Sequence, residues 1–133
     1  MSYKYTFGLL ALLLLAACAQ EKENPSLTFQ RLLCNGMEQP RCVDDLTPTF
    51  SWAVRSTGFN KQQSAYQLQV ATTAEKLRTG DADMWDSGKV SSSQSAYIKY
   101  DGEVLVPIEL YYWKVKIWDE EGKVSAWSEE QVF

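Results

Sequence analysis

The sequence predicts an all-β fold in which seven antiparallel strands form a two-sheet sandwich. Residues 111–118 alternate between two faces, which indicates a strand with one side in a core and one side outward. Six further short runs of this kind are separated by turn residues at spacings of about eight to twelve, which is typical of a Greek-key sandwich. The sequence contains no long amphipathic helix and no internal repeat.

The first 17 residues predict a lipoprotein signal peptide. Lys4 supplies a positive charge, and residues 7–15 form an apolar run too short to span a bilayer as a helix. Small residues then precede Cys18, as in the bacterial lipobox, whose cysteine is acylated before cleavage. An ordinary signal peptide with a chance cysteine is the alternative. We expect Cys18 to be lipidated and the protein to be an exported lipoprotein of the outer membrane.

We expect residues 18–26 to be the acylated cysteine and a polar tether, and residues 27–133 to be the sandwich domain. Several acyl chains on Cys18 would anchor the protein stably, whereas one chain binds a membrane only marginally. The tether mixes Gln, Glu and Lys and resembles the surface-export signal of Bacteroidetes lipoproteins. A plain solvated linker is the alternative to exposure at the cell surface.

Charge and composition narrow the classes of function. Without Lys4, 12 basic side chains stand against 17 acidic ones, a net charge of −5 for the mature chain. No cluster of Lys and Arg is present, so nucleic acid is not an expected partner. The chain has no histidine, the usual general base of Ser and Cys nucleophiles and the commonest metal ligand. We therefore expect neither a metal site nor a cofactor.

Two cysteines besides Cys18, Cys34 and Cys42, are candidates for a disulfide. Seven residues separate them, among which Gly36 and Pro40 bend the chain. An exported compartment permits the bond, which would stabilise the fold by about 2 kcal/mol. Two free, half-buried thiols are the equal alternative.

The strand candidates follow one another along the mature chain. The first three are residues 27–33, 49–54 and 65–71, of which the third alternates most clearly. Residues 72–79 hold a single helical turn at most, capped by Thr73 and stopped by Gly80. Residues 84–90 are a short edge strand broken at Gly88, and residues 95–100 are the next strand. Asp101-Gly102 then predicts a hairpin turn.

The last two strands are residues 111–118 and a return strand that starts at 124–127, joined by a turn at 119–122. Tyr111 stands at the start of the first of them, six residues after Leu105 and four after Pro107. This spacing is typical of a tyrosine corner, in which the tyrosine hydroxyl bonds to the backbone of the preceding loop. The expected core contains Trp52, Tyr66, Leu68, Val70, Tyr111, Trp113, Val115 and Ile117.

Five motifs resemble one family in their order and spacing: PTFSW at 48–52, SAYQLQVA at 64–71, WDSGKV at 85–90, YYWKVKIWDEEG at 111–122 and SAWS at 125–128. They resemble the N-terminal fibronectin type III/Ig-like domain of bacterial, Bacteroidetes-type α-L-rhamnosidases. The resemblance covers residues 27–133. The segment 34–45 departs most, because the family often has Asn-Pro-Leu-Gly-Ile-Asp there and this chain has NGMEQPRCVDD at 35–45.

The resemblance implies a non-catalytic accessory module of an exported rhamnosidase-type glycoside hydrolase system, as a fragment or stand-alone. In the family, catalysis belongs to a downstream (α/α)6 barrel, so no catalytic residue can be transferred to this chain. We expect that nothing after the sandwich holds a catalytic domain, and that the chain is not an enzyme. The expected partner is a catalytic domain or a glycan. A stand-alone surface lipoprotein that binds carbohydrate or docks a protein is the alternative.

Two clusters of acidic residues lie in predicted turns. Glycoside hydrolysis needs two carboxyl groups that face each other across a cleft, about 5–10 Å apart. Acidic residues in turns are more often solvated, and Asp119, Glu120 and Glu121 fit that description. Asp81, Asp83 and Asp86 supply oxygens of the kind that calcium prefers, but they lack the spacing of known calcium loops.

Four aromatic residues are candidates for contact with a sugar or a neighbouring domain: Trp85, Tyr112, Trp118 and Trp127. Tyr112 and Trp118 lie on the polar parity of their strand, where exposed rings can stack on sugars. The alternative is that these rings pack against the stems of Lys114 and Lys116 or form an interface between domains.

Overall fold

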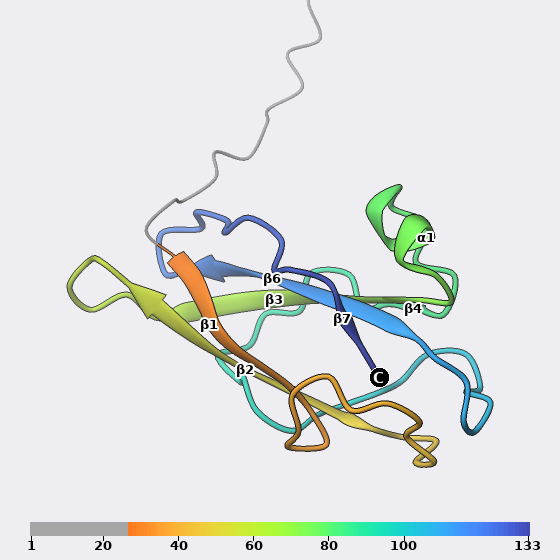
Figure 1. Ribbon diagram of the computed structural model, residues 1–133. Helices are drawn as coiled ribbons and strands as arrows, with labels where there is room; N and C mark the ends of the chain where they lie inside the picture. Colours follow the sequence, from red (N-terminus) through yellow and green to blue (C-terminus); the bar gives the residue numbers. More distant parts are fainter. Residues whose placement is uncertain (1–26) are drawn as a thin grey trace, which may run out of the picture.

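The computed structural model describes residues 27–133, which form two antiparallel β-sheets packed face to face (Figure 1). The three-stranded sheet has the order β1-β2-β5, with β1 at Leu27–Cys34, β2 at Thr49–Ser56 and β5 at Ile98–Lys99. The four-stranded sheet has the order β4-β3-β6-β7, with β4 at Trp85–Asp86, β3 at Gln63–Ala71, β6 at Tyr112–Asp119 and β7 at Gln131–Val132. The predicted seven-stranded β-sandwich is confirmed. The predicted signal peptide, tether and Cys18 lie outside the described residues.

The four long strands form where the alternation predicts them. β3 and β6 pair in register from Ala65 opposite Trp118 to Ala71 opposite Tyr112. β1 pairs with β2, with an irregularity between Phe29 and Arg31. Irregularities of this kind protect an edge strand, because they disturb the row of free backbone groups that another chain would need.

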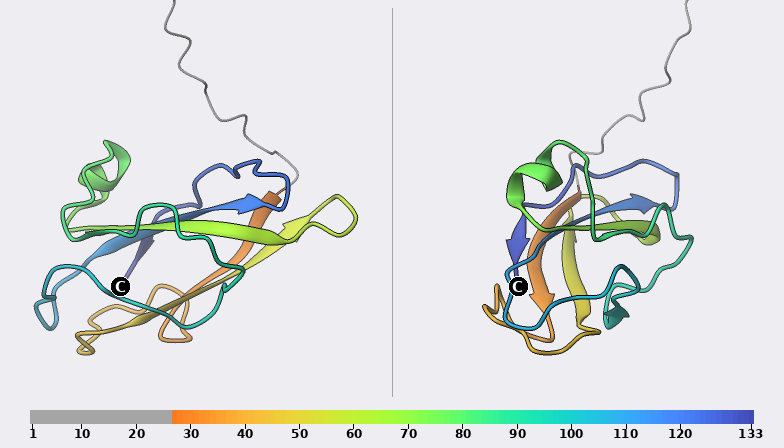
Figure 2. Two further views of the ribbon diagram at one scale, coloured as in Figure 1. Left: turned by 180° about the vertical axis from the view of Figure 1, so that it is seen from behind. Right: turned by 90° about the vertical axis from the view of Figure 1, so that its right-hand side faces the viewer.

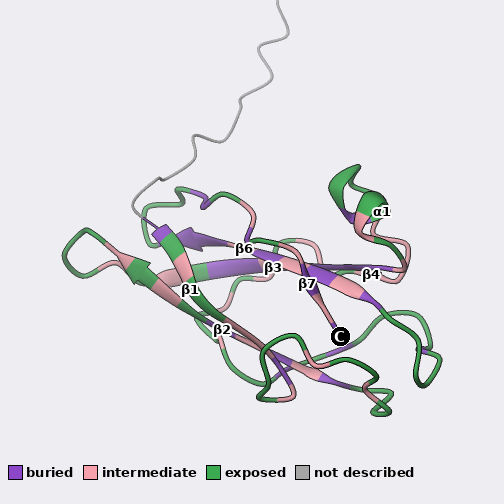
Figure 3. Cartoon of the chain, viewed as in Figure 1, coloured by how far each residue is buried: buried purple, intermediate pink, exposed green. Residues whose placement is uncertain are grey.

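The core lies between the two sheets, where the buried faces meet (Figure 3). Phe50 is at its centre, with ring centroids 4.7 Å from Trp113 and 5.4 Å from Phe133. The expected core is confirmed, and the structure adds Leu27, Cys34, Phe50, Ile98, Tyr100, Leu105 and Phe133. At about 1.5–3 kcal/mol for each fully buried large side chain, this packing is the main stabilising term.

Two edge strands are shorter than predicted because serine hydroxyls replace main-chain partners. In the predicted strand 84–90 only Trp85–Asp86 is regular, and the next position in the ladder is filled by Ser87. The Leu68 N–H donates to the Ser87 hydroxyl oxygen at 2.8 Å. Residues 124–127, the predicted return strand, are likewise not a regular strand, and the regular pairing with β6 comes later, at β7.

The predictions for residues 95–102 are partly wrong. Only Ile98–Lys99 forms a strand, because Tyr97 adopts a φ of 58° and is exposed, which breaks the alternation. Asp101-Gly102 is not a hairpin turn, since β5 pairs with β2 and the next strand, β6, belongs to the other sheet. Gly102 is needed instead for close packing, because a Cβ there would overlap the backbone oxygen of Met84.

The helix α1 spans Ala74–Arg78 and follows its predicted signals. The Thr73 hydroxyl accepts a hydrogen bond from the Lys76 N–H at 3.1 Å, and Gly80 takes a φ of 82° after the last turn. No helix in residues 27–133 has the length and apolar character to cross a membrane.

The two ends of the sandwich carry different loops (Figures 1 and 2). Leu27 pairs with Ser56, so β1 begins at the end that holds the β2–β3 loop. Phe133 exchanges two backbone hydrogen bonds with Tyr111, so β7 ends at the opposite end. The loops from β1 to β2 and from β5 to β6 lie at that second end, beside the C-terminal residue.

Candidate functional site

Lysine and tryptophan side chains alternate on the outer face of the four-stranded sheet. The Lys116 Nζ lies 4.8 Å from the ring centroid of Trp127 and 5.1 Å from that of Trp118. The Lys114 Nζ lies 4.5 Å from the Trp127 ring, and the Lys89 Nζ lies 4.6 Å from the Trp118 ring. These are cation–π distances. We call these five residues the tryptophan–lysine ladder.

Two serines hold Trp127 over β6. The Val115 N–H donates to the Ser128 hydroxyl, and the Ile117 N–H donates to the Ser125 hydroxyl, both at 3.0 Å. The same serines return backbone N–H bonds to the carbonyls of Val115 and Ile117 at 2.8 Å. The segment between them is thereby fixed along the edge of β6, and the Trp127 side chain is directed over the lysines of that strand.

The four aromatic residues singled out in the sequence do not share one surface. Trp118 is 2% exposed and packs with Ala65 and Val124 in a small second core. Trp85 is half-buried against the main core, with its ring centroid 5.4 Å from that of Tyr100. Tyr112 and Trp127 are half-buried, and Trp127 has lysine ammonium groups over its ring.

Lys114 ties the ladder to α1. Its Nζ donates a hydrogen bond to the Leu77 carbonyl at 2.8 Å, and burial lowers the pKa of this ammonium group. An ion pair between Arg78 and Glu130 joins the same helix to the segment before β7. The outer face of the sheet is therefore occupied by contacts within the domain.

The carboxylates of the first acidic cluster have separate local partners. Asp83 accepts bonds from the Thr72 hydroxyl at 2.7 Å and from the Lys76 Nζ at 2.8 Å. Burial alone would raise the pKa of Asp83, but these bonds lower it to about 2. Asp86 accepts instead from the side chains of Gln67 and Gln69, at 2.8 and 2.9 Å.

The second acidic cluster closes the turn after β6. Asp119 is 1% exposed, and its Oδ1 accepts the N–H groups of Glu121 and Lys123, each at 2.9 Å. The Lys61 Nζ lies 3.3–3.7 Å from carboxylate oxygens of Asp119, Glu120 and Glu121. In the part of the chain that the structure describes, no group of three or more potential ligands could hold a metal ion.

The two candidate disulfide cysteines are free thiols in the structure. Cys34 is 1% exposed and belongs to the core, whereas Cys42 is exposed in the β1–β2 loop. Burial, with a smaller effect from the charge of Asp45, raises the pKa of the Cys34 thiol to about 12. Cys34 is the last residue of β1 and lies in the core between the sheets, whereas Cys42 is exposed to solvent. The two thiols are therefore in different environments.

The tyrosine corner is confirmed. The Val106 N–H donates to the Tyr111 hydroxyl oxygen at 2.9 Å, and Tyr111 is 6% exposed. The bond fixes the β5–β6 loop to the first residue before β6.

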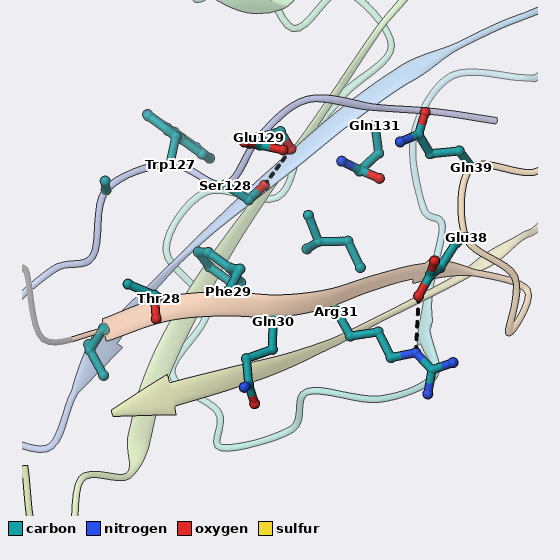
Figure 4. A pocket seen from close by; sticks show the side chains of 13 residues that line it. Thr28, Phe29, Gln30, Arg31, Glu38, Gln39, Trp127, Ser128, Glu129 and Gln131 are labelled. Carbon is teal, nitrogen blue, oxygen red and sulfur yellow. Dashed lines mark hydrogen bonds and ion pairs between the residues drawn. The ribbon is translucent and has the colours of Figure 1, made fainter. Parts of the chain in front are cut away.

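A groove of about 460 Å³ lies between the edges of the two sheets, and the sequence gives no signal for it. Figure 4 shows Thr28 to Arg31 of β1 on one side and Trp127 to Gln131 on the other. Arg31 and Glu38 form an exposed ion pair of 3.3 Å at its rim. Residues distant in sequence meet here through sheet packing, so no local pattern could have predicted it.

Sequence reasoning also missed an exposed aliphatic stretch in the β5–β6 loop. Its exposed side chains are Val104, Val106, Ile108 and Leu110. The run VLVPIEL at 104–110, without a strand or a helix to bury it, was the available signal.

Comparisons with known proteins agree on one family. Residues 29–133 match the family described as Rha78A-like, N-terminal immunoglobulin domain. An α-L-rhamnosidase of Formosa agariphila is 43% identical over 98% of this chain and 14% of its own length. An α-L-rhamnosidase of Streptomyces avermitilis is 40% identical over 69% of this chain and 9% of its own length.

Solved structures give the same result. The α-L-rhamnosidase from Dictyoglumus thermophilum matches with a TM-score of 0.76 and 38% identity, over 80% of this chain and 12% of that one. The S. avermitilis α-L-rhamnosidase in complex with L-rhamnose matches with a TM-score of 0.75 and 36% identity, over 80% and 10% of the two chains. The chain thus spans about one seventh or less of these relatives. It belongs to the family of Rha78A-like N-terminal immunoglobulin domains of α-L-rhamnosidases.

Proposed function

We propose that this chain is the non-catalytic N-terminal module of an exported α-L-rhamnosidase system, in which it supports or docks a catalytic domain. The observation that supports this proposal is the family match over 29–133 together with the small share, 14%, of the Formosa relative that the chain covers. The remaining length of that relative is where we place the catalytic machinery.

The contacts of the carboxylates favour a module without catalysis. A glycosidase needs two carboxyl groups free to reach a sugar from opposite sides. Asp83, Asp86 and Asp119 are instead engaged by groups of this domain, at 2.7–2.9 Å in their closest hydrogen bonds. The hydrogen bonds that these carboxylates accept stabilise turns and strand edges of the domain.

The covered rings disfavour the alternative of a stand-alone carbohydrate-binding lipoprotein. Stacking on a sugar requires an open aromatic face. Trp118 is buried, and lysine ammonium groups lie over the rings of both Trp118 and Trp127. Supporting a neighbouring domain requires no such face.

Lipidation at Cys18 and attachment to the outer membrane, with exposure at the cell surface, are part of the proposal. The similarity to the Formosa protein covers 98% of this chain and so extends to residues before Leu27. Metabolic labelling with a fatty-acid analogue in a Gram-negative host tests the idea. Label in the wild-type chain and none in Cys18→Ser is the expected result; equal labelling would contradict it.

A domain graft tests the accessory role. Residues 29–133 replace the matched segment of the Formosa enzyme, and the graft is compared with the intact enzyme and with the enzyme lacking that segment. We expect the graft to regain the thermal stability of the intact enzyme, and a Phe50→Asp graft, whose core is disrupted, to fail.

Activity of the purified chain is measured separately on an aryl α-L-rhamnoside. No cleavage is expected. Cleavage by the chain alone, or a folded graft no more stable than the truncated enzyme, would overturn the proposed function.

A further inference from the structure

The loop between β5 and β6 exposes four aliphatic side chains on one domain end. The exposed fractions are 83% for Val104, 55% for Val106, 71% for Ile108 and 38% for Leu110. We call residues 103–110 the apolar loop. Exposed apolar groups that cluster on a surface mark interaction sites, whereas scattered ones do not.

The apolar loop is held in a defined conformation. The Glu103 N–H donates to the Met84 carbonyl at 2.8 Å, and the Tyr100 hydroxyl donates to the Glu103 carbonyl at 2.7 Å. Leu105 is buried in the core, and the Val106 N–H donates to Tyr111. The domain therefore presents these side chains on a fixed support, and such preorganisation lowers the entropic cost of binding.

Ile108 adopts a backbone conformation that its side chain disfavours. Val106 to Glu109 form a turn in which the Glu109 N–H approaches the Val106 carbonyl at 3.4 Å, with Pro107 second and Ile108 third. The φ of Ile108 is 67°, and glycine is the residue preferred at this position after proline. A β-branched residue at positive φ is strained, and strain of this kind concentrates at binding sites.

The apolar loop lies beside the C-terminal residue of the domain. Leu110 immediately precedes Tyr111, which exchanges backbone bonds with Phe133. In the rhamnosidase relatives the matched domain is N-terminal and covers 14% or less of the polypeptide, so their chain continues from this end of the sandwich. Leu27, which follows the proposed lipid anchor at Cys18, lies at the opposite end of the domain. The apolar loop is therefore far from the anchored end, which argues against a membrane as its partner.

We propose that the apolar loop is the docking surface for the domain that follows in the rhamnosidase polypeptide, against which it buries Val104, Val106, Ile108 and Leu110. This inference rests on the proposed function and assigns it a surface. The partner surface is apolar, because the exposed side chains of the loop are aliphatic apart from Glu103 and Glu109 and include no aromatic ring that could stack on a glycan.

Hydrogen exchange in the graft of residues 29–133 tests the surface. Amides of residues 104–106 and 108–110 are expected to exchange at least about tenfold more slowly in the graft than in the free chain. The double variant Val104→Ser/Ile108→Ser should abolish that protection and lower the melting temperature of the graft. Phe59→Ser is the matched control, because Phe59 is fully exposed in the β2–β3 loop at the other end.

The outcomes separate the two proposals. A graft that regains stability while residues 104–110 exchange as in the free chain would overturn the docking surface and leave the proposed function intact. A folded graft in which neither stability nor exchange changes would contradict both. Protection of the same residues in the free chain at high concentration would assign the loop to self-association and overturn the inference.

Ile108→Gly in the free chain supplies a second test that needs no graft. Glycine relieves the strained φ, so we expect a higher melting temperature for the free chain and weaker protection of the loop in the graft. A fall in the melting temperature of the free chain larger than the entropic cost of a glycine would mean that the Ile108 side chain packs within its own domain, which would contradict the proposed role.

Discussion

The Lys114 ammonium lies 4.5 Å from the ring centroid of Trp127, which belongs to the segment between the turn after β6 and β7. Lys116 lies over the same ring at 4.8 Å, so two cations from alternate positions of β6 share one tryptophan. A segment without regular strand structure is thus fixed to the sheet by serine hydroxyls and by contacts to this ring.

Replacing Trp127 by Leu should destabilise the domain by about 1–3 kcal/mol, because leucine keeps apolar area but has no ring to attract the lysines. Urea unfolding followed by circular dichroism measures the change. Phe59→Leu is the control, since Phe59 is fully exposed and should shift stability by less than about 0.5 kcal/mol. Equal effects of the two substitutions would contradict a stabilising ladder.

Tyr111→Phe should cost about 1–2 kcal/mol, because it removes the hydroxyl that accepts the Val106 N–H at 2.9 Å. The ring still fills its place in the core, so the loss isolates the hydrogen bond. Faster exchange of the Val106 amide is expected in the same variant. Tyr97→Phe, at a residue 76% exposed, serves as control. An unchanged Val106 amide would show that the corner does not hold the loop.

The regular part of the fold could be predicted because burial imposes a period of two on strands with one covered face. β3 and β6 follow this rule, so their inward residues from Tyr66 to Val70 and from Trp113 to Ile117 were found from the sequence. The tyrosine corner was predictable for a different reason: its geometry depends on local spacing from Leu105 to Tyr111.

The edge strands and the surfaces could not be predicted in the same way. Ser87, Ser125 and Ser128 accept main-chain N–H bonds through their hydroxyls, and such side chains carry no period. Polar parity on β6 suggested exposed rings, yet Trp118 is buried because Val124 and two lysines cover it. Which groups cover an outer face depends on distant segments.

The buried Cys34 and the exposed Cys42 should differ in reactivity. In a Cys18→Ser chain, iodoacetamide at about pH 8 should modify Cys42 and leave Cys34 unmodified until urea unfolds the domain. Cys34 is 1% exposed, and a pKa of about 12 leaves roughly one thiol in ten thousand as thiolate at that pH. Peptide mapping by mass spectrometry reads both sites. If both cysteines resist modification and a reductant makes both reactive, they form a disulfide instead.

Asp83 should make stability depend on acid pH. Its pKa of about 2 in the folded domain lies below the ordinary value of 3.8. Its stabilising contribution is therefore present above about pH 4 and is lost as the pH falls through about 2. Asp83→Asn should cost about 1–2 kcal/mol near neutral pH, because the Lys76 ammonium and Thr72 lose a charged acceptor.

The difference between Asp83→Asn and the wild type should shrink as the pH is lowered from about 4 to about 2, since the wild-type carboxylate is then protonated as well. Urea unfolding at several pH values measures it. Asp81→Asn is the matched control, because Asp81 is exposed in the same loop, whereas the hydrogen bonds from Thr72 and from the Lys76 ammonium go to Asp83. If the loss of unfolding free energy in Asp83→Asn stays constant over this pH range, the charge of the Asp83 carboxylate does not stabilise the fold. The Lys76 ion pair would then contribute nothing measurable.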